Sequence, residues 1–217
     1  MRVTLKFSLI VILLGIISII VPRLVSGSRV PALSPGSTAF RITLIVILLG
    51  IIGIVPRILS SSRVPTPTPG IAAPDFTLRS QQGTLVSLKD YRGSWIVLYF
   101  YPRDQTPGCT REAHNFQADQ SKYAERHAVI LGVSVDSVDS HKKFCAKEGL
   151  NFKLLADSDG KVSQAYGSLT NLGVVKFAAR HTFLIDPTGK VATAYTTVDP
   201  AHHSEEVLAT LDQLQKQ

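Results

Sequence analysis

A seven-residue apolar run followed by a cysteine places the strongest constraint on how this chain can fold. Trp95–Tyr101 is rich in aromatic and β-branched residues and ends at Pro102, which is typical of a buried strand. Thr110–His127 has a helical composition, so Cys109 falls in the first turn of a helix that follows a core strand. The backbone N–H groups there are unpaired and the helix dipole is positive, which favours a thiolate over a thiol. The pattern therefore predicts a reactive cysteine.

Charge is divided unevenly along the 217 residues. Seven of the 23 basic residues and none of the 16 acidic residues lie in residues 1–70. In residues 71–217, the remaining sixteen basic residues are therefore balanced by all 16 acidic residues. The net charge of +7 therefore belongs to the N-terminal part. This argues against nucleic-acid binding, which requires a basic folded domain. Two cysteines are too few for a disulfide scaffold, which favours a catalytic or redox role.

The N-terminal part contains a tandem repeat. Leu9–Ile17 recurs identically as Leu44–Ile52, inside apolar runs at residues 7–21 and 42–55. These runs have 15 and 14 residues, whereas a membrane-spanning helix usually needs ~20. Because Arg2 precedes the first run and the runs lack a polar face, they resemble a signal-peptide core or a marginal membrane span.

Two domains are expected from this division. Residues 1–70 are interpreted as a duplicated hydrophobic targeting or membrane-anchor region that ends in a Pro/Ser-rich linker. The 147 residues from 71 to 217 suffice for one globular domain. We therefore expect a protein that is membrane-associated or exported through residues 7–21 and 42–55. Basic residues lie before, between and after the runs, so the side of the membrane stays open.

Residues 71–217 alternate between strand-like and helix-like patterns. Core strands are predicted at 95–101 and 129–135, short strands at 76–78, 85–88 and 154–156, and a hairpin at 181–185 and 191–195. Helices are predicted at 110–127, 137–148, 160–166 and 201–214. This order predicts an α/β protein of thioredoxin-like fold, with a central mixed β-sheet flanked by helices and preceded by the N-terminal hydrophobic segment.

Several motifs in this part resemble the peroxiredoxin family. The spacing Pro102-x3-Thr106-x2-Cys109 is similar to the active-site signature of the family, and Ala73–Leu78 is similar to its usual domain start. Further stretches resemble the PrxQ branch, also called bacterioferritin-comigratory protein: Phe100–Pro102, Thr106–Glu112, Ser140–Phe144 and Thr182–Asp186. The resemblance covers residues 71–217 and leaves the N-terminal repeat outside it.

The resemblance implies a role for each matching residue. Cys109 would be the peroxidatic cysteine, which a hydroperoxide oxidises to a sulfenic acid. Thr106 would hydrogen-bond the thiolate and the attacked peroxide oxygen, and Pro102 would shield the pocket from water. Arg180 would hold the thiolate and polarise the peroxide. No metal or organic cofactor is implied, because sulfur carries the electrons. Glu112 is interpreted as a cap or brace of the same helix.

Recycling of the cysteine is where this chain departs from many PrxQ proteins. They carry a resolving cysteine five residues after the peroxidatic one, and here that position is His114. The other thiol is Cys145, and the resemblance to some members implies a Cys109–Cys145 disulfide that thioredoxin or a similar dithiol reduces. Its formation would need local unfolding around Cys109. A buried core thiol is the competing interpretation of Cys145.

The function that the resemblance implies is a thiol peroxidase acting on hydrogen peroxide and organic hydroperoxides. Two alternatives stay open: a one-cysteine peroxidase that needs an external thiol, and a peroxide-sensing or binding module with Cys109 as its redox switch. A thioredoxin-like disulfide oxidoreductase is disfavoured, because no second cysteine completes a Cys-x-x-Cys pair. The expected partners are a hydroperoxide and a dithiol reductant but no nucleic acid, and the chain is expected to be a monomer.

Overall fold

The structure, a computed structural model, describes residues 64–216. Its strands are β1 (Thr77–Ser80), β2 (Leu85–Ser87), β3 (Trp95–Phe100), β4 (Ala128–Ser134), β5 (Lys153–Ala156), β6 (Leu169–Asn171), β7 (Lys176–Ala178), β8 (His181–Ile185) and β9 (Val191–Tyr195). Its helices are η1 (Leu88–Tyr91), α3 (Pro107–Ala118), α4 (Gln120–Glu125), α5 (Val138–Glu148), α6 (Lys161–Ala165) and α7 (His203–Leu214).

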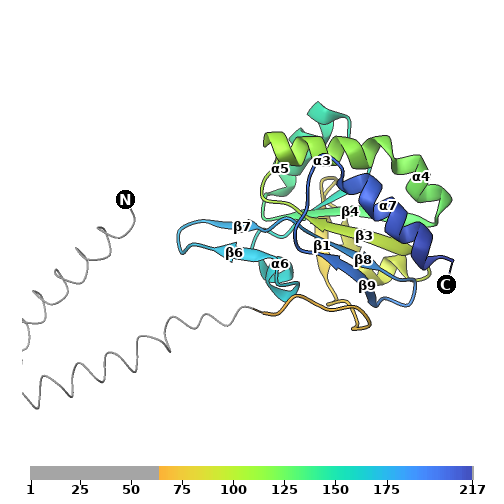
Figure 1. Cartoon of the computed structure of the whole chain (residues 1–217). Coiled ribbons are helices and arrows are strands. Elements are labelled where there is room, and N and C mark those ends of the chain that lie inside the picture. Colours follow the sequence, from red (N-terminus) through yellow and green to blue (C-terminus); the bar gives the residue numbers. More distant parts are fainter. Residues whose placement is uncertain (1–63, 217) are drawn as a thin grey trace, which may run out of the picture. The chain divides into compact units, whose positions relative to one another are not determined.

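Seven of the strands form one mixed sheet in the order β2-β1-β5-β4-β3-β8-β9 (Figure 1). β3 pairs in parallel with β4, and β4 pairs in parallel with β5. β8 runs antiparallel to β3 on its other side and continues into the antiparallel pair with β9. The predicted thioredoxin-like α/β fold with a central mixed sheet is therefore confirmed.

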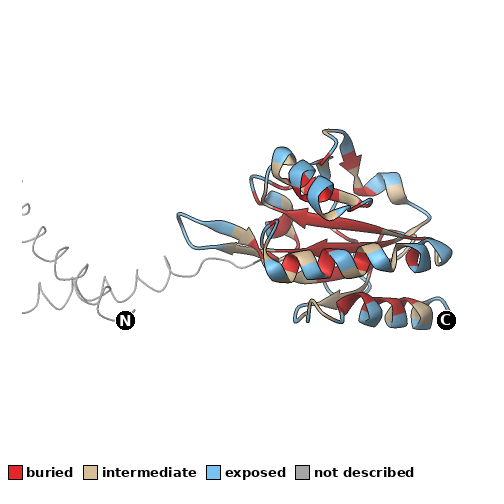
Figure 2. Ribbon diagram, turned by 90° about the horizontal axis from the view of Figure 1, so that it is seen from above, coloured by how far each residue is buried: buried red, intermediate tan, exposed pale blue. Residues whose placement is uncertain are grey.

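The side chains of β3 alternate between two apolar clusters, one on each face of the sheet. Val97 and Tyr99 belong to a cluster that also takes buried residues from α3, α4, α5 and α7. Leu98 and Phe100 belong to the other cluster, with Tyr166 at the end of α6. Figure 2 shows the buried residues concentrated in the central strands and on the inner faces of the helices. Both cysteines lie in the first cluster.

The helix predicted at residues 110–127 begins earlier than expected and is divided in two. α3 starts at Pro107, where proline is tolerated because the first N–H of a helix has no partner within the helix. It ends at Ala118 and is followed by Asp119, whose carboxylate accepts hydrogen bonds from Lys122 and from Ser204 in α7. The earlier start keeps Cys109 within the first turn of α3.

A second sheet of two strands was not predicted. β6 and β7 pair in antiparallel fashion, and each has only three residues, too few for a period of two to be recognised. β7 ends at Ala178, two residues before Arg180. The small hairpin therefore leads directly into the segment that carries the predicted active-site arginine.

The localisation predicted from the N-terminal runs, a membrane-associated or exported protein, is wrong. Within residues 64–216, no helix has the length and apolar character needed to cross a membrane. Residues 7–21 and 42–55, on which the prediction rested, lie outside the described residues. The end of the predicted linker is packed on the domain, since the Gly70 N–H donates to the Val191 carbonyl at 2.8 Å.

Candidate active site

Cys109 is buried at the N-terminus of α3, with 1% of its surface exposed. It is the third residue of the helix, after Pro107 and Gly108, and Thr106 occupies the capping position with an extended backbone. Side chains in this turn lie near unpaired N–H groups and the positive end of the helix dipole. Cys109 is therefore buried at a helix terminus of the kind that hosts reactive cysteines.

Arg180 contacts Cys109 from the segment before β8. Its Nη2 donates to Cys109 Sγ at 3.3 Å, and its Nη1 forms an ion pair with the Glu112 carboxylate. The side chain of Arg180 is 19% exposed, so water only partly screens its charge. The sequence-predicted pair of Cys109 and Arg180 is thus together in space, and one guanidinium bridges the thiol and a carboxylate.

Glu112 lies one helical turn after Cys109 and is 1% exposed. Burial raises the pKa of its carboxyl group to about 7, although the Arg180 guanidinium opposes the shift. Its Oε1 has no hydrogen-bond partner among the described residues. The sequence suggested Glu112 as a cap or brace of the helix, and the structure shows that it pairs with the guanidinium that contacts Cys109.

Thr106 and Pro102 lie in the loop between β3 and α3. The Thr106 hydroxyl donates to the Arg103 carbonyl at 3.0 Å, a bond that closes the loop just before the helix. Pro102 is half-buried beside the end of β3. Gln105 has a φ of +60°, the left-handed region that costs a non-glycine residue some strain. The roles of Thr106 and Pro102 toward the thiolate stay predictions.

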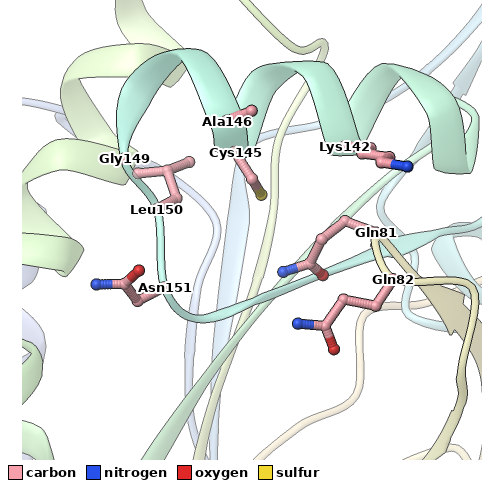
Figure 3. A pocket seen from close by; sticks show the side chains of 8 residues that line it. All are labelled: Gln81, Gln82, Lys142, Cys145, Ala146, Gly149, Leu150 and Asn151. Atoms are coloured by element: carbon pink, nitrogen blue, oxygen red, sulfur yellow. The ribbon is translucent and has the colours of Figure 1, made fainter.

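Cys145 lies near the C-terminal end of α5, and like Cys109 it is a free thiol. Burial raises the pKa of Cys145 to about 11, and the negative charge of Asp104 adds to this effect. A cavity of about 580 Å³ adjoins it, lined also by Gln81, Gln82 and Lys142. Figure 3 shows the Cys145 sulfur pointing from α5 toward the segment with Gln81 and Gln82.

A buried polar cluster connects the loop before Cys109 to the helix that carries Cys145. Asp104 accepts hydrogen bonds from Tyr101 Oη at 2.7 Å, Ser140 Oγ at 2.7 Å and His141 Nδ1 at 2.9 Å. Sequence reasoning missed this cluster. One available signal was that His141 stands four residues before Cys145, so that both lie on one face of a helix. Among residues 64–216, no group of three or more His, Cys, Asp or Glu side chains could hold a metal ion.

Comparison with known proteins assigns this arrangement to a family. The AhpC/TSA family pattern matches residues 69–194, more than half of the chain. The chain belongs to the AhpC/TSA family. Peroxiredoxin Bcp of Bacillus subtilis is 43% identical over 143 residues, which cover 64% of this chain and 91% of that protein. The chloroplastic peroxiredoxin Q of Sedum lineare is 39% identical over 142 residues, which cover 65% of this chain and 76% of that protein.

A solved structure extends the comparison to the fold. Bacterioferritin comigratory protein of Xanthomonas campestris, described for its alkyl peroxide reduction activity, aligns with a TM-score of 0.60 and 39% sequence identity. The alignment covers 64% of this chain and 91% of that one. The resemblance to the PrxQ or Bcp branch of the peroxiredoxins is therefore confirmed, and with it the enzyme class, a thiol-dependent peroxidase.

Proposed function

We propose that residues 71–217 form the catalytic domain, in which Cys109 reduces hydrogen peroxide and organic hydroperoxides. The Cys109 thiolate attacks the terminal peroxide oxygen, an S–O bond forms, and the O–O bond breaks. Sulfur becomes a sulfenic acid, and the departing hydroxide or alkoxide takes up a proton to leave as water or an alcohol. Preorganised donors stabilise the negative charge that develops on the leaving oxygen.

The contact between Arg180 and Cys109 is the observation that carries this proposal. Its Nη2 lies 3.3 Å from the sulfur. A planar guanidinium has five N–H donors, so one that binds both the sulfur and Glu112 retains capacity for a peroxide oxygen. Thr106 is proposed to turn its hydroxyl from the Arg103 carbonyl toward the bound peroxide, and Pro102 to exclude water from the pocket.

Recycling is proposed to pass through Cys145. Its thiol attacks the Cys109 sulfenic acid, a disulfide forms and water leaves, after which thioredoxin or a similar dithiol reduces the disulfide. Cys109 is at the start of α3 and Cys145 near the end of α5, so local unwinding around Cys109 accompanies the step. The domain is proposed to work as a monomer, because both cysteines come from one chain.

Intact mass after one equivalent of hydrogen peroxide tests this cycle. The 71–217 domain should lose about two mass units, and Cys109→Ser or Cys145→Ser should each abolish that loss. A gain of about 16 or 32 units on Cys109 that persists in Cys145→Ser would instead indicate a one-cysteine peroxidase. No change in mass would contradict the peroxidase and favour a binding module.

A further inference from the structure

Cys145 is a weak nucleophile in its present surroundings. Burial raises its pKa to about 11, and only the thiolate form of a cysteine attacks another sulfur. Only 8% of its surface is exposed, and that part faces the cavity of about 580 Å³. If Cys145 is to resolve the sulfenic acid near neutral pH, a group beside it must accept its proton.

His141 is placed to do so. It precedes Cys145 by four residues on α5, and side chains at this spacing on a helix are neighbours, with Cβ atoms about 5–6 Å apart. Both side chains are buried on the same face of α5. The imidazole is 0% exposed, and its Nε2 has no hydrogen-bond partner among the described residues, the Cys145 thiol included, so its lone pair is available once that thiol approaches.

Asp104 fixes the orientation of this imidazole. The His141 Nδ1 lies 2.9 Å and 3.1 Å from the two carboxylate oxygens, and because a carboxylate accepts, Nδ1 carries the proton. In the neutral imidazole, Nε2 then holds a free lone pair. Burial alone would raise the pKa of Asp104, but hydrogen bonds from His141, Ser140 and Tyr101 outweigh it and lower the pKa.

The groups that face His141 come from three segments. Tyr101 and Asp104 belong to the end of β3 and the following loop, and the Tyr101 hydroxyl lies 3.3 Å from Nδ1. Asp136, after β4, accepts the Asp104 N–H at 2.9 Å and holds that loop. Ser140 and Cys145 are on α5 itself. The Asp104 carboxylate lies on the Nδ1 side of the ring and leaves Nε2 on the other side without a partner among the described residues.

We propose that His141, oriented by Asp104, is the general base that takes the proton from Cys145 when the Cys109 sulfenic acid is resolved. The Cys145 S–H proton moves to Nε2, the sulfur attacks Cys109, and the S–OH bond breaks. The leaving hydroxide then takes the proton from the imidazolium, so the products are a disulfide, one water molecule and neutral His141. The inference rests on the proposed role of Cys145 as resolving cysteine.

The test follows the two steps separately in the full chain. Rapid-quench mass spectrometry after a pulse of hydrogen peroxide gives the rate of sulfenic acid formation and the rate at which it becomes the disulfide. The second rate is compared with the first in the same variant, from about pH 6 to about pH 10. His141→Gln removes the base. His114→Gln, which makes the same change at an exposed position of α3, is the matched control.

In His141→Gln, disulfide formation at about pH 7 should slow at least tenfold. A general base typically contributes about 10²–10⁴-fold, so a tenfold loss is a conservative threshold. The deficit should shrink as pH rises, because Cys145 then ionises without help. Imidazole in the buffer should partly restore the rate in His141→Ala. Asp104→Asn, which takes away the carboxylate that fixes the tautomer, should slow the same step and provides a second variant should His141→Gln not fold.

An unchanged rate in His141→Gln, or a deficit that is the same at every pH and that imidazole does not relieve, would overturn the general base. In that case the unmodified chain still forms the disulfide, so the proposed peroxidase cycle stands. Failure of the unmodified chain to form any disulfide would overturn both, and only that outcome counts against the proposed recycling itself.

Discussion

The two cysteines of this domain are both buried, yet their surroundings differ in charge. Cys109, 1% exposed, lies at the positive end of α3 and receives an N–H from Arg180 at 3.3 Å. Cys145, 8% exposed, lies near the C-terminal end of α5, with the Asp104 carboxylate close enough to help raise its pKa to about 11. Burial is therefore only one of the influences on these thiols, and the sign of the nearby charges is another.

In the proposed cycle, this difference suits the two thiols to different steps. Cys109 has positive donors beside it when a peroxide arrives, whereas Cys145, with its pKa raised to about 11, needs a base before it can attack a sulfenic acid. The arrangement also limits unwanted oxidation of Cys145, because oxidation follows thiolate character and exposure.

The largest expected effect comes from removing one sulfur or the other. Cys109→Ser should abolish peroxide consumption, because no other described thiol has charged donors around it. Cys145→Ser should keep the first turnover and lose continued turnover with thioredoxin and its reductase. Peroxide loss and NADPH oxidation, followed side by side, measure the two effects. Continued turnover in Cys145→Ser would contradict the division of roles.

The next largest effect concerns the charge beside Cys109. Arg180→Ala should lower the second-order rate of Cys109 oxidation by about 10²–10³-fold, the typical cost of losing one preorganised donor at a developing oxyanion. The rate in Arg180→Lys should lie between those of the unmodified protein and Arg180→Ala, because an ammonium cannot bridge sulfur and carboxylate as a planar guanidinium does. Arg111→Ala, an exposed arginine on the same helix, is the control. Equal rates in Arg180→Ala and the control would show that the helix terminus alone activates the sulfur.

A smaller effect should appear in alkylation of the reduced protein. At about pH 7, iodoacetamide should modify Cys109 well before Cys145, although the cavity of about 580 Å³ beside Cys145 can admit the reagent. The rate at Cys145 should keep rising toward its pKa of about 11. Peptide mass mapping over a pH series measures both sites. Faster labelling of Cys145 than of Cys109 at about pH 7 would contradict the expected order of reactivity of the two thiols.

The sequence predicted the fold well where hydrophobic patterns were long. β3, β4, α5 and the β8–β9 hairpin are present within one or two residues of their predicted bounds, because each buries a continuous apolar face. The three-residue strands β6 and β7 were missed for lack of any such pattern. The break at Asp119 depends on contacts with Ser204, which is distant in sequence.

The candidate site was predictable only in part, for a similar reason. Cys109 and Arg180 were found through a motif and a family resemblance, and the structure places them in contact. The pairing of Arg180 with Glu112 joins residues 68 apart, and that of Asp104 with His141 joins residues 37 apart. Such pairs depend on the order of strands in the sheet, which local patterns do not determine.

The smallest expected effect is a pH dependence of stability that comes from Glu112. Its pKa is about 7 in the folded protein against an ordinary value of 4.5, so the folded state binds the proton more tightly than the unfolded chain. Stability contributed by this group is therefore present below pH 4.5 and is lost as pH rises toward 7. Glu112→Gln should remove that slope, and exposed Glu125→Gln should not.

Urea denaturation at about pH 5 and about pH 8 gives the free energy of unfolding of the unmodified protein and of Glu112→Gln. The effect is the change, between the two pH values, in the difference between these two free energies. The expected change is at most about 3 kcal/mol, since one pKa unit corresponds to about 1.4 kcal/mol. Using the difference cancels the opposite slope from Asp104, whose pKa is lowered. A difference that stays constant with pH would mean that Arg180 keeps Glu112 ionised throughout, and the guanidinium beside Cys109 would then be neutralised by a full negative charge.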